Sequence, residues 1–324
     1  MKRRTFHAEG VLVGRPVVEA VAAQLDVAVE HALQLVEAGA VYVGGRRCRE
    51  GGLRLRAGQV VAVVLEEGGR SPLEALAPPP ALGVLFEDEA LIAVDKPVGI
   101  TAQPTEGRAG GSLVDLVSER LGQLAGLVHR LDRETSGVTV FGKTPQATTA
   151  LAAEFREGRA RKRYVAATGP GLPASGTVDL PLSRDPARPG RWRASRAANG
   201  VPALTDFRTL YSGADFCLVE LLPQTGRTHQ LRAHLTALGA PILGDSRYGG
   251  AATAGGLSAG RCLLHAQGLE LAHPLTGAAL RIEAPLPGDL RCFFTAAEVQ
   301  APEGPLPVLR PRTESPRPPP SPGR

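Results

Sequence analysis

The segment LVHRLDRETSGVTVFGKT, residues 127–144, joins a highly charged loop to a strand and decides the fold around it. Its last part, VTVFGK, has the β-branched and aromatic residues that favour a strand. Its first part places Asp132 between Arg130 and Arg133, close to His129. This carboxylate is either one partner in a surface salt bridge or a reactive group that is kept ionised in a cleft for polyanions. The sequence on both sides of the segment bears on that choice.

Further strands are predicted on both sides of the segment. The pattern ALIAVDKP predicts a strand that Pro97 ends. RKRYVAATG predicts another, and ALTDFRTLY and FCLVELLP predict a pair joined by an SGAD turn. Because tight turns join these strands, we expect an α+β fold with a mixed, mostly antiparallel sheet and flanking helices, not a doubly wound parallel sheet.

Three helices are predicted to flank this sheet. SLVDLVSERLGQL, residues 112–124, begins with Ser112 as its N-cap. TPQATTALAAEFREG, residues 144–158, begins with Thr144 as its N-cap and has a proline at the first helical position. TGRTHQLRAHLTALG, residues 225–239, is expected to be the third helix and to end at Gly239.

Composition divides the chain into four parts. Residues 1–70 are expected to form a small α/β module with two helices and a hairpin about the Gly-Gly turn of AVYVGGRRC. The proline-rich segment 71–80 predicts a linker, and residues 81–300 then form the main domain. Residues 301–324 contain so many prolines that neither helix nor sheet can form, which predicts a disordered tail.

The bulk composition narrows the classes of protein. The 324 residues carry a formal net charge of +5 and a pI near 9.3, which is compatible with a nucleic-acid partner. Lysine is nearly absent, and arginine suits phosphate contacts and base stacking, although genomic base composition can also favour arginine. The four scattered cysteines argue against a disulfide framework. With no secretory signal and no apolar run long enough for a membrane span, we expect a cytoplasmic monomer.

The common motifs of metal and cofactor sites are missing. His229 and His234 are five positions apart in HQLRAH, without the glutamate of H-E-x-x-H. Ser136 lies in ETSGV, which is not the G-x-S-x-G of a nucleophile elbow. No P-loop is present, and no G-x-G-x-x-G follows a predicted strand. The sequence therefore predicts neither a metal nor a cofactor.

Two basic runs are candidates for RNA contact. EFREGRARKRY, residues 154–164, has five cations against two acids, and RDPARPGRWRASR, residues 184–196, has five arginines and the only tryptophan. Cations interleaved with aromatic residues suit phosphates and unpaired bases. Taken alone, each run is more often a solvated surface, but two such runs flanking the same predicted sheet favour RNA contact more than either does alone.

The sequence HRLDRETSG resembles the signature H-R-L-D-x-x-T-S-G of the RluA-type RNA pseudouridine synthases. Four further blocks follow the family's order and, with VDKPVGI upstream, the resemblance covers roughly residues 82–287. These downstream blocks are RKRYVAATG, GVPALTDFRTL, QTGRTHQLRAHLTALGAPILGDSRYGG and LLHAQGLELAHPLTG. Residues 17–65 also resemble, less closely, the S-four-type RNA-binding module. The resemblance implies the pseudouridine synthase fold preceded by this module.

The resemblance implies a reaction without an outside cofactor. The N1–C1′ bond of a uridine in RNA breaks, the base turns, and a C5–C1′ bond forms. Asp132 matches the essential aspartate, which acts at C6 of the base or at the sugar; the sequence leaves this open. Burial against a uracil raises the pKa of a carboxylate and a guanidinium opposes that shift, and Arg232 matches the family's paired arginine. The target must also leave its stack, and Arg130 is expected to fill the vacated space.

The remaining site residues follow from the same blocks. Tyr164 matches the tyrosine that stacks on the target base and moves a proton from C5, and Leu264 matches an apolar residue of the base pocket. Arg133, Arg227 and Lys162 are expected to contact the RNA. The histidines His129 and His229 are expected to have supporting roles, and Thr135, Ser136 and Gly137 to shape the turn into the next strand.

The expected function is isomerisation of specific uridines in structured RNA. Because a module precedes the main domain, ribosomal RNA of the large subunit is favoured over transfer RNA. One alternative is a catalytically silent RNA-binding protein, which the presence of Asp132, Tyr164 and Arg232 disfavours. Another is a carboxylate-based glycosidase or nucleoside hydrolase, but such enzymes use a pair of carboxylates, and the matching blocks offer one essential acid.

Overall fold

The structure is a computed structural model, and it describes residues 2–66, 82–104, 111–196 and 200–307. The predicted linker 71–80 and most of the predicted tail lie outside these ranges.

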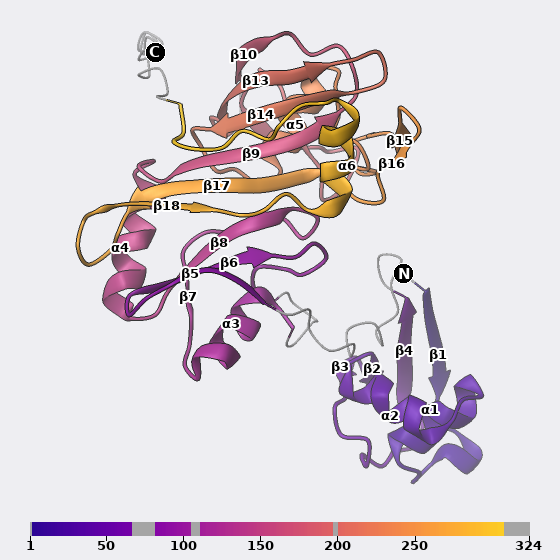
Figure 1. Cartoon of the computed structure of the whole chain (residues 1–324). Helices are drawn as coiled ribbons and strands as arrows, with labels where there is room; N and C mark the ends of the chain where they lie inside the picture. Colours follow the sequence, from indigo (N-terminus) through magenta and orange to yellow (C-terminus); the bar gives the residue numbers. More distant parts are fainter. Residues whose placement is uncertain (1, 67–81, 105–110, 197–199, 308–324) are drawn as a thin grey trace, which may run out of the picture.

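The N-terminal part has one four-stranded antiparallel sheet with two helices (Figure 1). Its elements are β1 (Lys2–His7), the short 3-10 helix η1 (Gly10–Leu12), α1 (Val17–Leu25), α2 (Val29–Glu37), β2 (Val41–Val43), β3 (Arg46–Arg47) and β4 (Val60–Glu66). The strand order is β1-β4-β2-β3. Both helices and the Gly-Gly turn were predicted, whereas β1 was not, because its successive cations hide the alternation of a strand.

The main domain is built on a ten-stranded sheet. Its strands are β5 (Gly83–Glu87), β6 (Leu91–Lys96), β7 (Gly126–Leu127), β8 (Ser136–Gly142), β9 (Arg161–Thr168), β10 (Ser175–Asp179), β13 (Leu204–Ser212), β14 (Cys217–Pro223), β17 (Leu264–Ala272) and β18 (Ala279–Glu283). The order is β10-β13-β14-β9-β17-β8-β6-β5, with β18 beside β17 and β7 beside β8. Among the described pairs only β17 and β8 are parallel, so the sheet is mixed and mostly antiparallel, as predicted.

Helices and two short hairpins complete the domain. They are α3 (Leu113–Leu121), α4 (Pro145–Arg156), α5 (Gln230–Ala237) and α6 (Gly288–Ala296), with hairpins β11–β12 (Leu182–Arg184 and Trp192–Ala194) and β15–β16 (Thr253–Ala254 and Leu257–Ser258). The predicted caps are confirmed: Ser112 forms a capping box with Asp115 at α3, and Thr144 accepts from the amide of Ala147 at α4.

The central strands are covered on both faces, which explains their continuous hydrophobic sequences. In β6, Leu91 joins a core with Leu151 of α4, whereas the next residue, Ile92, joins a core with Leu113 of α3. Because side chains alternate along a strand, α3 and α4 pack on opposite faces of β6.

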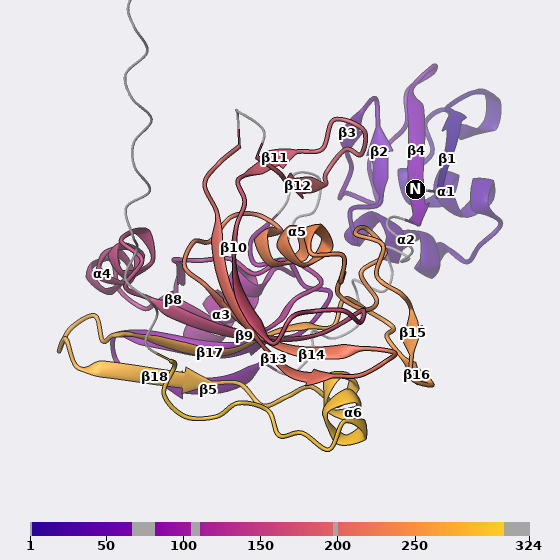
Figure 2. The ribbon, with the colours of Figure 1, turned by 90° about the horizontal axis from the view of Figure 1, so that it is seen from above.

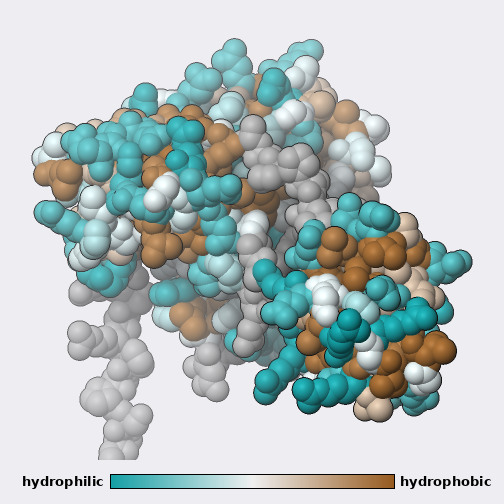
Figure 3. Space-filling model, turned by 90° about the horizontal axis from the view of Figure 1, so that it is seen from below, coloured by the Kyte–Doolittle hydropathy of each residue, from teal (hydrophilic) through white to brown (hydrophobic). Residues whose placement is uncertain are grey.

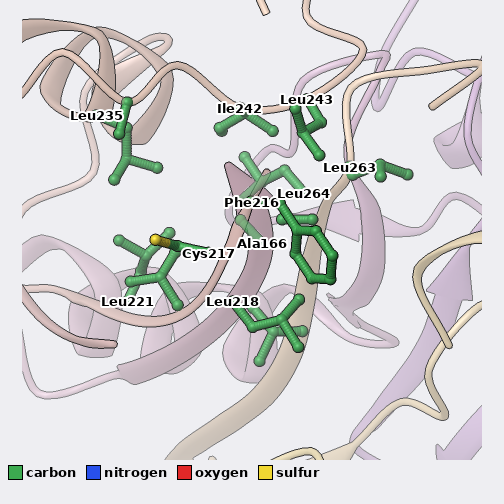
Figure 4. Packing of buried hydrophobic residues seen from close by; sticks show 14 of the residues in the cluster. Ala166, Phe216, Cys217, Leu218, Leu221, Leu235, Ile242, Leu243, Leu263 and Leu264 are labelled. Atoms are coloured by element: carbon green, nitrogen blue, oxygen red, sulfur yellow. The ribbon is translucent and has the colours of Figure 1, made fainter. Parts of the chain in front are cut away.

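The other half of the sheet is sandwiched in the same way. Helices α5 and α6 lie on opposite sides of it (Figure 2). Leu235 of α5, Leu221 of β14 and Leu264 of β17 belong to one buried cluster (Figure 4). This packing holds α5 rigidly above the strands, which matters because α5 carries a residue of the site.

Two predicted boundaries are wrong. The third helix was expected from residue 225 but begins at Gln230, because His229 has a left-handed backbone (φ 55°) that a helix cannot contain. The disordered tail was expected from residue 301, yet Leu306 is 5% exposed. The buried Arg163 donates to the carbonyls of Pro302, Gly304 and Pro305, which satisfies a segment without regular structure.

The surface mixes polar and apolar side chains. On the face shown in Figure 3, hydrophobic groups lie among hydrophilic ones on both parts of the chain. Among the described residues, none of the helices has the length and apolarity that crossing a bilayer requires.

Candidate active site

The loop between β7 and β8 carries Asp132 and is fixed at several points. The His129 Nε2 accepts from the backbone amide of Val140, 3.1 Å away, and its ring stacks on Phe155. Burial lowers the pKa of His129 to about 3, so the ring is neutral and suited to a structural role. On the other side of Asp132, the carbonyl of Arg133 accepts from the amide of Gly99 at 2.8 Å.

Lys96 ties the same loop to the end of β6. Its buried ammonium donates to the carbonyls of Pro97, Ile100 and Arg133 at 3.0, 2.9 and 3.5 Å. Sequence reasoning had no role for this lysine, although it lies in the VDKPVGI block. It holds the loop in place by filling all its donor positions with backbone oxygens.

The loop leads into β8 where that strand meets β17. Gly137 has a φ of 115°, and a Cβ there would lie 2.2 Å from the Ala266 carbonyl oxygen, so only glycine fits. Beside it, the Ser136 hydroxyl and the Nδ1 of His265 are 3.0 Å apart and buried. These residues shape the turn, as predicted.

Asp132 lies in this loop, and its side chain faces α5. Its Oδ2 is 3.5 Å from Nη1 of Arg232, and its side chain is 25% exposed. The structure thus brings together the two residues that the sequence paired across 100 positions. The carboxylate is open enough to meet a substrate and has a guanidinium beside it.

Arg232 has two further carboxylate partners that were not predicted. The Asp245 carboxylate accepts hydrogen bonds from Nε and Nη2 of Arg232, at 2.7 and 2.8 Å, and a Glu134 oxygen lies 3.3 Å from Nη1 of Arg232. Burial alone would lower the pKa of Arg232, but the hydrogen bonds that it donates to Asp245 more than offset this effect and raise that pKa. Arg232 therefore holds two further acids besides the one essential acid that was expected.

Asp245 cannot act on a substrate. Its side chain is 1% exposed and both of its oxygens are used by Arg232. It fixes the guanidinium so that one edge remains for Asp132. Asp245 lies in the GDSRYGG part of a matching block, but nothing in that short sequence distinguishes it as a partner of Arg232.

Tyr164 and Leu264 form an apolar wall beside Asp132. They lie on neighbouring strands, β9 and β17, and Leu264 is 3% exposed. Burial, and secondarily the charge of Asp132, raise the pKa of Tyr164, so its hydroxyl keeps its proton at neutral pH. The wall presents a flat aromatic ring and an aliphatic group, which suit a nucleobase.

These residues line one cleft of about 900 Å³. The predicted residues that line it are Asp132, Tyr164, Arg232, Arg130, Arg133, Arg227, Leu264 and Lys162. Arg130 and Arg227 are exposed at the cleft, and Arg227 donates to the carbonyl of Pro202 at 3.2 Å. All eight predicted residues therefore meet in one place.

Lys162 is a half-buried cation of the cleft. It stands two positions before Tyr164 on β9, so both side chains point to the same face. Among the described residues, no carboxylate lies within 4.0 Å of its ammonium. Burial lowers the pKa of Lys162 to about 8. Such a group gains from an anion that enters the cleft.

No grouping of histidine, cysteine and acidic side chains within the described ranges could hold a metal ion. The arrangement instead offers the Asp132 carboxylate beside a guanidinium, a wall for a flat base and basic residues for phosphates. It can bind a nucleotide unit and attack it with a carboxylate oxygen.

Known proteins are similar to this chain in sequence and in fold. Residues 90–237 match the family model described as RNA pseudouridylate synthase. The ribosomal large subunit pseudouridine synthase D of Nitrosomonas europaea is 38% identical over 225 residues, covering 66% of this chain and 65% of that protein. An RNA pseudouridine synthase of Chloroflexus aurantiacus is 37% identical over 275 residues, covering 83% of this chain and 85% of that protein.

A solved structure agrees with these relatives. Human RNA pseudouridylate synthase domain containing 4 superposes with a TM-score of 0.54 at 28% identity, covering 68% of this chain and 95% of that one. These matches confirm the resemblance of HRLDRETSG and its companion blocks, and they confirm the fold class. The chain belongs to the RluA-type RNA pseudouridine synthase family.

Proposed function

We propose that this protein converts a uridine of large-subunit ribosomal RNA to pseudouridine, with Asp132 as the catalytic carboxylate. The observation that carries the proposal is the position of Asp132. It lies 3.5 Å from Arg232 and lines the same cleft as Tyr164 and Leu264. A flipped uridine between that wall and the carboxylate would have its reacting atoms beside Asp132.

The reaction is an isomerisation and balances without a co-reactant. Asp132 attacks either C6 of the uracil or C1′ of the ribose, and the N1–C1′ bond breaks. The freed uracil turns, C5 bonds to C1′, and the bond to the Asp132 oxygen breaks, which regenerates the carboxylate. C5 loses its proton and N1 gains one. Arg232 would steady the carboxylate through these steps because Asp245 holds the guanidinium in place.

Tyr164 would stack on the target base and not accept the C5 proton. Its raised pKa means that the hydroxyl is already protonated at neutral pH, so it is a poor base. This favours the first of the two roles that the resemblance implies for this tyrosine.

The basic residues of the cleft would hold the RNA backbone. Lys162 is half-buried and has no carboxylate partner in the described part of the chain, so a phosphate next to the target uridine would be its counterion. Arg133 and Arg227 line the same cleft and would contact the RNA, and Arg130, which also lines it, would enter the space that the flipped base leaves.

The choice of ribosomal RNA rests on the relatives. The Nitrosomonas protein is named for the large ribosomal subunit. Residues 1–70 are proposed as an S-four-like RNA-binding module, joined by the linker 71–80 to a catalytic domain. That domain extends to residues 302–307, several carbonyls of which accept hydrogen bonds from Arg163. The cleft is complete within one chain, which supports a monomer, and a ribosomal substrate implies the cytoplasm.

Two other functions are less well supported. A glycosidase needs a second carboxylate across the substrate. Asp245 is sealed against Arg232, and the more exposed Glu134 and Glu157 are paired, the first with Arg232 and the second with Arg156 and Arg159. A catalytically silent RNA-binding protein would not need Asp132 to lie next to Arg232 in the cleft that Tyr164 and Leu264 line.

The test is to map pseudouridines in total RNA from cells with and without the gene. One or more sites in large-subunit ribosomal RNA should disappear and return on complementation. Complementation with Asp132→Asn should restore RNA binding but none of the sites. Lost sites in transfer RNA would replace the proposed substrate, and normal modification by Asp132→Asn would end the proposed chemistry.

A further inference from the structure

His229 is the second polar neighbour of Asp132 and has an unusual backbone. Its Nε2 is 3.9 Å from the Asp132 Oδ2, and its side chain is 13% exposed. Its φ of 55° is in the left-handed region, which β-carbon-bearing residues avoid unless the surroundings impose it. The chain therefore accepts local strain to place this imidazole over the carboxylate.

The ring of His229 is held by Tyr248. The Tyr248 Oη lies 3.0 Å from the His229 Nδ1 and accepts a hydrogen bond from the backbone amide of Trp192 at 2.9 Å. Tyr248 is 3% exposed, and its ring is flanked by the guanidinium groups of Arg232 and Arg191, each 5.0 Å from its centroid. The hydroxyl thus has one fixed position.

The hydrogen-bond pattern selects one tautomer of His229. The Tyr248 oxygen accepts from Trp192, and among the hydrogen bonds of the described residues the Nδ1 of His229 is the one acceptor for the proton of this hydroxyl. An Nδ1 that accepts leaves the ring proton on Nε2, which faces Asp132.

Burial keeps the His229 ring neutral in spite of the charge of Asp132. Burial lowers the pKa of His229, and the negative Asp132 opposes this without reversing it. The charged groups that face the ring are Asp132, Arg232, Arg247 and Glu134. At neutral pH the ring therefore acts as a single N–H donor and not as a cation.

We propose that Tyr248 is a positioning residue that holds the His229 ring with its proton on Nε2, directed at Asp132. Because the Trp192 amide fixes the Tyr248 hydroxyl, the position of the His229 ring depends on how the β11–β12 hairpin packs. The inference rests on the proposed function only in that Asp132 is the group being positioned. RNA that contacts the hairpin would then shorten the 3.9 Å gap to a hydrogen bond.

The hairpin is suited to such a signal. Arg188 and Arg193 are exposed, and Arg184 lies over the Trp192 ring at 5.9 Å. Strand β12 packs beside α5, the helix that follows His229. The hairpin and the carboxylate are thus linked through one hydroxyl.

The first experiment is Tyr248→Phe, which keeps the ring and removes the hydroxyl. Single-turnover isomerisation should slow about tenfold, while RNA affinity stays within about twofold of the unchanged protein. Nitrogen NMR of labelled histidine should show the Nε2–H tautomer of His229 in the unchanged protein and a mixture in Tyr248→Phe. Unchanged rate and unchanged tautomer would overturn the positioning role.

A matched pair at residue 229 separates the donor from the backbone. Asparagine tolerates the left-handed conformation better than glutamine, but only the longer glutamine can place an N–H where Nε2 lies. A donor role predicts that His229→Gln isomerises faster than His229→Asn; a purely structural role predicts the reverse order.

The hairpin link is tested at the Trp192 amide. Trp192→Pro removes the N–H, whereas Trp192→Ala keeps it and loses the same ring. Trp192→Pro should slow the reaction beyond Trp192→Ala and should add nothing to Tyr248→Phe. Equal rates for the two Trp192 variants would overturn the link. If the unchanged protein isomerises no RNA, the proposed function fails, while the NMR result still decides the positioning of His229.

Discussion

The two arginine-rich runs, 154–164 and 184–196, have similar compositions but opposite roles in the structure. In the first run, Arg163 is buried against Glu220 at 3.0 Å, and Arg161 pairs with Glu270 at 3.0 Å. In the second run, only Arg191 has a carboxylate within 4.0 Å among the described residues, and most of its arginines are exposed. Charge density in a sequence therefore does not tell a structural cation from one that is free to meet RNA; burial and a carboxylate partner do.

The largest effect should come from the buried arginine of the first run. Arg163→Ala leaves Glu220 with only Arg208, and it removes the donors to the carbonyls of residues 302, 304 and 305. The free energy of unfolding should fall by about 3 kcal/mol because a buried charge loses its main partner. Urea unfolding measures this.

The double variant Arg163→Met with Glu220→Leu is the control for that prediction. It should recover much of the lost stability, because no buried charge remains. A single variant as stable as the unchanged protein would remove the distinction between the two runs.

The next effect should be on RNA binding by the second run. Arg184→Ala combined with Arg193→Ala should weaken binding and reduce the slope of log affinity against log salt by about 2, one for each lost phosphate contact. Stability should change by no more than about 0.5 kcal/mol. An unchanged salt slope would mean that the hairpin does not touch RNA, and the two runs would then differ only in exposure.

Lys162 is the exception within the first run and sharpens the comparison. Its pKa is lowered to about 8, so the ammonium is charged below pH 8 and loses its charge as the pH rises. The dissociation constant for RNA should therefore increase above pH 8, by up to about tenfold per pH unit. Lys162→Arg stays charged and should remove this dependence. Identical pH profiles for the two proteins would contradict a phosphate contact.

The smallest effect is expected at Arg159, on the surface of the first run. It pairs with Glu154 and Glu157, and about half of its side chain is exposed. Because water screens such pairs, Arg159→Ala should leave the melting temperature and the RNA affinity unchanged within error. A clear loss of affinity would move this arginine into the RNA-binding group.

The features that sequence predicted well depend on neighbours along the chain. Ser112 and Thr144 start their helices through contacts three residues away, and Pro97 lies just past the end of β6. The pairing of Asp132 with Arg232 was reached only through the resemblance, since no local pattern joins residues 100 positions apart.

The features that were missed depend on distant partners. Asp245 and Tyr248 act through Arg232, His229 and Trp192, and a short GDSRYGG turn shows none of these contacts. The start of α5 was misplaced because a histidine in the left-handed region is not marked in the sequence. The tail was placed too early because Arg163 supplies hydrogen bonds that proline-rich sequence cannot make with itself.

The parallel contact between β8 and β17 has a consequence for how the protein matures. Ser136, which ends the Asp132 loop, meets His265, a residue made 129 positions later during synthesis. Such long-range pairing forms slowly and cannot be replaced by earlier strands. A nascent chain that has not yet released β17 from the ribosome therefore carries Asp132 on a loop whose following strand is still unpaired, and the proposed activity should begin only when nearly the whole domain has been made.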